Sequence, residues 1–162
     1  MTGVQTCALP IYSKLGAFTE DADEYQEVVD RLLVKWETAR TLVPEAEIEY
    51  SKFNSDAILS IGSCDGAVRE ALVRLGDRNI GLNYCRVRAF PFTDAVRDFI
   101  GKHERVYVVE QNRDAQLRTL LMLDIEADPR KLVSMLHYNG LPVSADFVVD
   151  RVLEEVAKGE AA

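Results

Sequence analysis

The sequence predicts an α/β domain in which a parallel sheet lies between two layers of helices, a three-layer α/β/α sandwich. Short apolar runs rich in β-branched residues recur along the chain, and such runs are typical of strands buried on both faces. Segments with apolar residues three and four positions apart separate them, so strands and helices alternate as in βαβ units with right-handed crossovers. A length of 162 residues, 48% of them hydrophobic, suits one domain with its own core.

The composition argues against several classes of function. The net charge is −8 and no concentrated basic patch accompanies it, so we expect no general binding to nucleic acid or to anionic membranes. No apolar run approaches the roughly 18 to 20 residues that a transmembrane helix needs. Cys7, Cys64 and Cys85 are odd in number and lack CxxC spacing, which argues against a disulfide framework and a zinc or iron–sulfur cage. These features suit a soluble protein of the reducing cytoplasm.

Residues 1–11, MTGVQTCALPI, differ from everything that follows. They carry no charge and no periodicity, and a proline interrupts their one apolar stretch. A signal peptide would need a basic start and a longer apolar region. The segment looks like translated sequencing-adapter DNA, so we interpret residues 1–11 as a non-native prefix and the native sequence as starting near Tyr12, in mid-chain. Residues 12–52 would form an N-terminal helix and a connecting edge strand, and residues 53–162 the α/β domain.

A long helix is expected to begin near Asp21 and to end near Leu42. Apolar residues recur there at spacings of three and four, acidic residues in the first turn favour the helix dipole, and Pro44 lies just beyond. We expect its apolar face to lie across the body of the protein. Apolar and polar residues alternate over residues 47–51, which is the pattern of a half-buried edge strand.

The next expected strand, residues 57–61, runs into a glycine turn, GSCDG, that starts at Gly62 and feeds a helix. Such a turn can hold a phosphate through free backbone N–H groups. GSCDG matches neither GxGxxG nor a Walker loop, however, and Asp65 would repel an anion. We therefore interpret it as a tight turn in which Asp65 caps the helix. Cys64 is interpreted as a buried, inert thiol, although a helix N-terminus can lower a thiol pKa.

Residues 82–89 predict a further strand that carries Arg86 and Arg88 on one face, because side chains alternate along a strand. Buried arginines need their charge compensated, so we expect carboxylates, a ligand or a partner chain to face them. Thr93 is expected to cap the helix that follows. His103 is expected at the C-terminal end of that helix, where it would interact with the helix dipole.

Residues 105–117 predict the central strand and the start of the helix after it. The run VYVV is typical of a doubly buried strand, and helical spacing follows from Asp114 onward. Glu110, Gln111 and Asn112 lie at the carboxyl end of this strand, which is where open α/β sheets form their crevices.

The last expected strand, residues 132–136, leads into a turn, and Ser144 is expected to cap the final helix. Neighbouring parallel strands end at the same edge, so we expect the polar residues of three strand ends to form one cluster, with at least one arginine against Glu110. Its expected members are Arg86, Arg88, Glu110, Gln111, Asn112, Gln116, His137 and Tyr138.

Residue chemistry alone assigns no catalytic, cofactor-binding or metal-binding residue. The sequence contains no recognisable nucleophile–base pair, metal-ligand cluster or phosphate loop. Two classes of function stay open on this basis. An independent small nucleotide-binding protein or enzyme would use the Gly62 turn and the crevice at Glu110, whereas an interaction domain would use the same edge to bind a protein.

Five segments carry a resemblance to a known family. They are TED at residues 19–21, KWETARTLVP at 35–44, RVRAFPF at 86–92, VYVVEQNRDAQL at 106–117 and LHYNGLP at 136–142. In this order and spacing they resemble the C-terminal part of the alpha subunit of 2-oxoacid:ferredoxin oxidoreductases, particularly the 2-oxoglutarate type. The resemblance covers nearly everything after residue 12. It implies a transketolase C-terminal-like domain with a mostly parallel five-stranded sheet, in which the first strand, residues 47–51, is antiparallel.

The resemblance also implies a role. The family oxidatively decarboxylates a 2-oxo acid to an acyl-CoA with thiamine diphosphate, magnesium and iron–sulfur chemistry, and it reduces ferredoxin. Its cofactor sites lie upstream of this region or on the beta subunit, so the resemblance implies no cofactor in this chain. It implies a truncated fragment, inactive alone, that acts as a structural and subunit-interface domain. The implied partners are the remainder of the alpha subunit and the beta subunit, with ferredoxin and CoA acting on the complete enzyme.

Overall fold

The computed structural model describes residues 12–51 and 55–160, so the segment interpreted as a prefix, residues 1–11, lies outside the described residues. The chain forms two compact units that divide between Leu42 and Val43. The edge strand therefore lies in the second unit, whereas the sequence grouped it with the preceding helix.

The first unit contains helix α1, Ala22–Leu42, at the expected position. The carboxylate of Asp21 caps it by accepting the backbone N–H groups of Asp23 and Glu24 at 2.9 and 3.0 Å. A short antiparallel bridge joins Tyr12 and Phe18 ahead of the helix. No residue of α1 is buried within this unit.

The second unit is built on a five-stranded sheet in the order β1-β3-β2-β4-β5. The strands are β1 (Glu47–Glu49), β2 (Asp56–Ile61), β3 (Asn83–Val87), β4 (Arg105–Glu110) and β5 (Leu132–Leu136). β3, β2, β4 and β5 pair in parallel. β1 pairs with β3 in antiparallel register and places Glu47 opposite Arg86. The mostly parallel sheet and the antiparallel first strand are thus confirmed.

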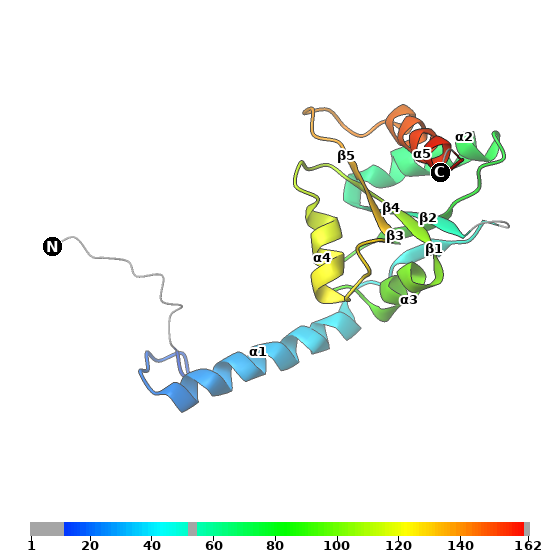
Figure 1. Ribbon diagram of the computed structural model, residues 1–162. Helices are drawn as coiled ribbons and strands as arrows, with labels where there is room; N and C mark the ends of the chain where they lie inside the picture. Colours follow the sequence, from blue (N-terminus) through cyan, green and yellow to red (C-terminus); the bar gives the residue numbers. More distant parts are fainter. Residues whose placement is uncertain (1–11, 52–54, 161–162) are drawn as a thin grey trace. The chain divides into compact units, whose positions relative to one another are not determined.

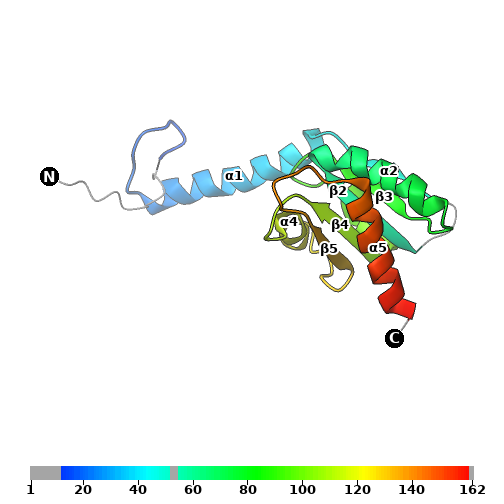
Figure 2. The same ribbon diagram turned by 90° about the horizontal axis from the view of Figure 1, so that it is seen from above.

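Helices cover both faces of the sheet (Figures 1 and 2). Helices α2 (Asp65–Gly76) and α5 (Ala145–Glu160) lie on one face, and α3 (Asp94–Lys102) and α4 (Gln116–Asp124) on the other. Alternate strand residues enter two separate cores, with Tyr107 on the α2 and α5 side and Val108 on the α3 and α4 side. The three-layer sandwich is confirmed. Within the described part of the chain, no helix is both long and apolar enough to cross a bilayer.

The helix ends agree only partly with the expected caps. Ser144 Oγ accepts the N–H of Phe147 at 3.2 Å and so caps α5. Thr93 occupies the N-cap position of α3, but its side chain makes no capping hydrogen bond. The prediction that Asp65 caps α2 is wrong, because the helix begins at Asp65 and Cys64 occupies the cap position.

His103 lies at the C-terminal end of α3, as the sequence predicts, and its ring forms hydrogen bonds on both sides. It is buried, and its Nδ1 donates to the carbonyl of Phe99 at 2.6 Å. Its Nε2 then accepts from the amide of Asn83 at 2.8 Å, and the amide oxygen of Asn83 accepts the N–H of Ser51 at 2.7 Å. His103 thereby joins α3 to the start of β3.

Candidate functional site

The two central strands, β2 and β4, end side by side where the connections of the sheet diverge. The chain leaves β2 through α2 to reach β3 on one side, and it leaves β4 through α4 to reach β5 on the other. α2 and α4 cover opposite faces, so these strand ends flank the switch point at which open α/β sheets bind ligands. The structure brings Glu110, Gln111 and Asn112 to this point, as the strand pattern predicts.

Glu110 caps helix α4 from the end of β4. It is 2% exposed, and its carboxylate oxygens accept the N–H groups of Leu117 at 2.7 Å and Arg118 at 3.3 Å. Asn112 completes the cap, since its amide donates to Glu110 at 2.6 Å and its oxygen accepts the N–H of Gln116 at 3.2 Å. Two side chains therefore satisfy the first three N–H groups of α4. The partial positive charge of the helix N-terminus compensates the buried carboxylate.

This cap weighs against a phosphate site at the Glu110 crevice. The N–H groups that would bind an anion are already occupied, and a carboxylate stands among them. The Gly62 turn is similar, because Asp65 lies in the first turn of α2. Its carboxylate accepts from the hydroxyl of Tyr84 at 2.9 Å and from Arg69 at 2.9 Å. Both helix N-termini at the switch point thus carry the chain's own negative charge.

A groove lies over the ends of β2, β4 and β5. It consists of two adjoining hollows of about 360 and 520 Å³ that share Ser63 and Gln111. His137 follows β5 and donates its backbone N–H to the carbonyl of Glu110 at 3.0 Å. Its ring packs edge-on against the ring of Phe147, with the ring centroids 4.9 Å apart. The polar residues that define this carboxyl-end groove are Ser63, Glu110, Gln111, Asn112, Gln116, His137 and Tyr138.

Cys64 also lines the groove, but its environment suppresses reactivity. The residue is 3% exposed, and burial, followed by the nearby charge of Glu110, raises the pKa of its thiol. A raised pKa keeps the thiol protonated near neutral pH, and the thiol is not the nucleophilic form. The interpretation of Cys64 as a buried, inert thiol agrees with this geometry.

Arg86 and Arg88 do not join the groove, so the predicted single cluster is wrong. Both pair with Glu47 of β1, at 3.2 and 3.6 Å, and neither contacts Glu110. The reason is the strand order, because β2 lies between β3 and β4 and separates their ends. The antiparallel pairing of β1 with β3 supplies a carboxylate directly opposite Arg86. The expectation that carboxylates face the two arginines is nevertheless met.

Arg69 of α2 extends this pairing into an arginine–carboxylate network. It contacts Asp65 at 2.9 Å, Glu47 at 3.4 Å and Glu49. The members of the network are Arg69, Arg86, Arg88, Glu47, Glu49 and Asp65. Three cations balance three carboxylates, and most of the side chains are partly exposed, so each pair contributes little to stability. The network joins α2 to the β1 edge of the sheet.

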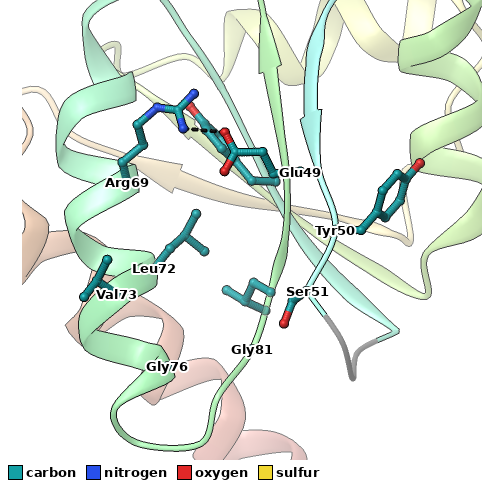
Figure 3. A pocket seen from close by; sticks show the side chains of 10 residues that line it. Glu49, Tyr50, Ser51, Arg69, Leu72, Val73, Gly76 and Gly81 are labelled. Atoms are coloured by element: carbon teal, nitrogen blue, oxygen red, sulfur yellow. Dashed lines mark hydrogen bonds and ion pairs between the residues drawn. The ribbon is translucent and has the colours of Figure 1, made fainter.

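Next to the network lies a cavity of about 400 Å³ between α2 and strands β1 and β3 (Figure 3). Arg69 reaches across its rim to Glu49, and Leu72 lies deeper along α2. The sequence did not single out Arg69, Glu47 or Glu49. The sequence shows that Glu47 and Glu49 alternate along a strand and that Asp65 and Arg69 lie four residues apart on a helix. Only the strand register shows that these side chains meet.

The residues that the structure describes do not fit the cofactors that the resemblance associates with the complete enzyme. No group of three or more His, Cys, Asp or Glu side chains within the described ranges could hold a metal ion. Cys64 and Cys85 pack in different cores, so they cannot share an iron–sulfur cluster. The two helix N-termini at the switch point already face carboxylates and do not suit a diphosphate.

Comparisons with known proteins point to a fold. No protein-family model matches this chain, and no curated protein matches its sequence. Among solved structures, the chain is similar to 2-oxoglutarate:ferredoxin oxidoreductase from Magnetococcus marinus with 2-oxoglutarate, coenzyme A and succinyl-CoA bound. That match has a TM-score of 0.77 and 21% identity, and it covers 90% of this chain and 26% of that one. The two share a fold.

A second match is the alpha chain of a probable 2-oxoacid ferredoxin oxidoreductase from Thermoplasma acidophilum, with a TM-score of 0.48, 23% identity, and coverage of 70% of this chain and 97% of that one. Since this chain spans 26% of the length of the Magnetococcus chain, the shared fold is that of one region of a larger protein.

Proposed function

We propose that this chain is the C-terminal structural and subunit-interface domain of the alpha subunit of a 2-oxoacid:ferredoxin oxidoreductase of the 2-oxoglutarate type. The observation that carries the proposal is the fold match to the Magnetococcus chain, which covers 90% of this chain and 26% of the other. The five sequence segments that resemble the same family, in order along the chain, support it independently. The complete enzyme would decarboxylate a 2-oxo acid oxidatively to an acyl-CoA and pass electrons to ferredoxin.

The chemistry of the carboxyl-end groove supports an interface role. Glu110 and Asn112 use their hydrogen-bonding groups to cap α4, and burial keeps the Cys64 thiol protonated. These side chains therefore offer neither a free base nor a nucleophile. Exposed groups, among them Gln111 and Tyr138, line the same groove and suit contact with another protein surface. Thiamine diphosphate, magnesium and the iron–sulfur cluster would be held by the remainder of the alpha subunit and by the beta subunit, in the cytoplasm.

Genomic sequence upstream of the codon for Tyr12 provides the first test. We expect the reading frame to continue upstream into a thiamine-binding domain in an intact copy of the gene.

Activity provides the second test. Expressed with its beta subunit, the product of the intact gene is expected to reduce ferredoxin with 2-oxoglutarate and CoA faster than with pyruvate or a branched 2-oxo acid. The isolated chain is expected to bind no thiamine diphosphate and to decarboxylate no 2-oxo acid. Stoichiometric cofactor on the isolated chain, or an unrelated upstream domain, would contradict the proposal.

The interface role is tested in the assembled enzyme with two substitutions of exposed apolar residues. Tyr138 is 64% exposed and lines the groove, whereas Leu123 is 74% exposed on α4 and does not line it. Tyr138→Ala is expected to weaken subunit association by about tenfold, as loss of an aromatic interface residue does. Leu123→Ala is the matched control and is expected to change association by less than about twofold. Equal effects of the two substitutions would remove the groove from the interface.

A further inference from the structure

We propose that Asn139 is a self-modification site, at which the side-chain carboxamide reacts with the chain's own backbone and is converted to a carboxylate. The site lies in the connection from β5 to α5, and the modification does not depend on the proposed function. Among the asparagines of the sequence, Asn139 alone precedes a glycine, Gly140. A side chain on the following residue hinders attack of its backbone nitrogen on the carboxamide, whereas glycine has no Cβ.

The turn holds the Asn139 side chain along the peptide unit that would attack it. Its carboxamide oxygen, Oδ1, accepts the backbone N–H of Leu141 at 2.9 Å, so the side chain folds back over Gly140 as in an Asx turn. This hydrogen bond draws electron density toward Oδ1 and makes the Cγ carbon a better electrophile. It also stabilises the negative charge that develops on Oδ1 during attack, as the donors of an oxyanion hole do.

The surroundings leave room for the reaction. Asn139, Gly140 and Leu141 are all exposed, so water, the second reactant, reaches them from solvent. Gly140 has a φ of 85°, in the left-handed region that glycine adopts readily. Apart from its chain neighbours, no atom of the described residues lies within 4 Å of the position that a Cβ on Gly140 would occupy. No neighbouring side chain therefore obstructs closure of a ring at this turn.

The reaction needs only water as a co-reactant. The backbone nitrogen of Gly140 forms a bond to Cγ of Asn139 and gives up its proton. The bond from Cγ to Nδ2 breaks, and ammonia leaves with that proton, so that a succinimide ring remains. Water then adds to either carbonyl of the ring and opens it. One opening yields aspartate, and the other yields isoaspartate, in which the main chain runs through Cβ and Cγ of residue 139.

Similar pairs elsewhere in the chain lack this combination of features. Asn83 is buried, and its side chain is hydrogen-bonded on both sides. Both ends of the Asn112 side chain take part in the cap of α4. Asp65 also precedes a glycine, but it lies in the first turn of α2, and its carboxylate binds Arg69. The helix fixes the backbone at Asp65, so we expect these three residues to stay unmodified.

Peptide mapping of the full chain after incubation at neutral pH tests the site. Trypsin releases residues 132–151 as one peptide, in which Asn139 is the one asparagine. We expect this peptide to show the mass change of an amide-to-acid exchange, and electron-transfer fragmentation to identify isoaspartate beside aspartate. Asn79 is the matched control, because it is also exposed but precedes the β-branched Ile80. Asn79 is expected to react at least about tenfold more slowly.

Two comparisons decide whether the folded turn reacts. Asn139→Ser keeps a side-chain acceptor for the N–H of Leu141 but removes the carboxamide, so we expect its peptide to stay unmodified. Wild-type chain in guanidinium chloride gives the rate without the turn, and the native chain is expected to react no more than about tenfold more slowly. A native chain that stays intact while the unfolded chain reacts would overturn the proposal, as would aspartate without isoaspartate, which would exclude the ring.

The modification changes one wall of the carboxyl-end groove. Gly140 and Leu141 line the same hollow as His137 and Tyr138. The new carboxylate adds a negative charge beside this wall, and isoaspartate also lengthens the main chain by a methylene group. Assembly at the groove would cover the turn, so the modification belongs to the unassembled chain. Its effect on assembly, unlike the modification itself, rests on the proposed function.

Association of fresh and incubated chains with the remaining subunits tests this effect. Incubated wild-type chain is expected to show a dissociation constant at least about threefold higher than fresh chain, whereas incubation is expected to leave Asn139→Ser unchanged. Equal association of fresh and modified wild-type chain would overturn the effect on assembly. Tyr138→Ala reports separately on whether the groove is an interface, so failure of the proposed function is distinguishable from failure of this effect.

Discussion

At the scale of single residues, two buried tyrosines show how much a hydroxyl group depends on its neighbours. Tyr84 is 1% exposed, and its hydroxyl lies 2.7 Å from Ser60 Oγ and donates to Asp65 at 2.9 Å. Tyr107 is fully buried, and its hydroxyl has no hydrogen-bond partner among the described residues. Both rings contact an arginine, Arg69 over Tyr84 and Arg105 over Tyr107. The two side chains therefore differ mainly in whether the hydroxyl is satisfied.

The same substitution is expected to destabilise the protein at Tyr84 but not at Tyr107. Tyr84→Phe is expected to lower the free energy of unfolding by about 1 to 2 kcal/mol, because it leaves the buried Ser60 hydroxyl without its partner. Tyr107→Phe is expected to leave it unchanged or to raise it by about 1 kcal/mol, because it removes an unsatisfied polar group. Urea denaturation measures both. A loss of more than about 1 kcal/mol for Tyr107→Phe would reveal a partner for its hydroxyl.

Cys85 makes stability depend on pH in the alkaline range. It is fully buried in β3, and burial raises the pKa of its thiol from the ordinary value of 9.0 to about 12. In the unfolded chain the thiol loses its proton near the lower value, whereas in the folded chain it keeps the proton. Its contribution to stability is therefore complete below pH 9.0 and is lost as the pH rises toward about 12.

Cys85→Ala is expected to make the alkaline loss of stability less steep. The substitution lowers stability at neutral pH by about 1 kcal/mol through a small cavity, but it removes the group that titrates. Ile58→Val is the control, since it also removes buried volume and is expected to keep the wild-type slope. Denaturation curves at a series of pH values between about 8 and 11 give the slopes. Parallel slopes for Cys85→Ala and wild type would show that the thiol does not contribute.

At the scale of elements, α4 depends on the strand before it. Its first N–H groups bind Glu110 and Asn112, which come directly from the end of β4. Ala115 at its N-cap position has no side chain that could accept a hydrogen bond, and its φ of 51° is in the left-handed region. The sequence EQN at the strand end is therefore required to start the helix. These residues couple β4 to α4, and this coupling explains why a glutamate is buried at the switch point.

Removal of the Glu110 carboxylate is expected to destabilise the domain. Glu110→Ala leaves the N–H groups of Leu117 and Arg118 unsatisfied and is expected to cost about 3 kcal/mol. Glu110→Gln keeps one acceptor oxygen and is expected to cost less than half as much. Glu104→Ala, at an exposed glutamate, is the control and is expected to change stability by less than about 0.5 kcal/mol. Urea denaturation measures the free energy of unfolding of each variant. A Glu110→Ala protein as stable as wild type would rule out the cap.

At the scale of the whole molecule, both hydrophobic cores belong to the second unit. Their buried residues run from Ala57 to Val152, and the first partly buried residue packed against them is Ala46. The core on the α2 and α5 side and the core on the α3 and α4 side share the strands of one sheet. The described residues of the second unit therefore contain both cores of the α/β sandwich.

Deletion of residues 1–42 is expected to leave the sandwich folded. The melting temperature of the 43–162 chain is expected to stay within about 4 °C of the full chain, the shift that corresponds to about 1 kcal/mol for a domain of this size. Circular dichroism follows the transition of both chains at the same protein concentration. A loss of the cooperative transition would show that the first unit completes the fold.

The sequence by itself determined where the strands and helices lie. Apolar runs such as VYVV in β4, and the helical spacing after each run, are local patterns set by the burial of nearby side chains. The cap of α5 was readable for the same reason, because Ser144 accepts a hydrogen bond from an N–H group only three residues away. The resemblance to a known family, which the order of the five motifs carries, predicted that the first strand is antiparallel.

Only the tertiary structure decided which charged side chains meet. Arg86 lies 39 residues from Glu47, and they meet because β1 runs antiparallel along the outer edge of β3. Arg86 is kept away from Glu110 because β2 is inserted between β3 and β4. Strand order and register are set by how whole faces of helices and sheet pack together, and a stretch of sequence does not encode them. That is why the buried carboxylate of Glu110 accepts hydrogen bonds from the N–H groups of α4, where the sequence suggested an arginine.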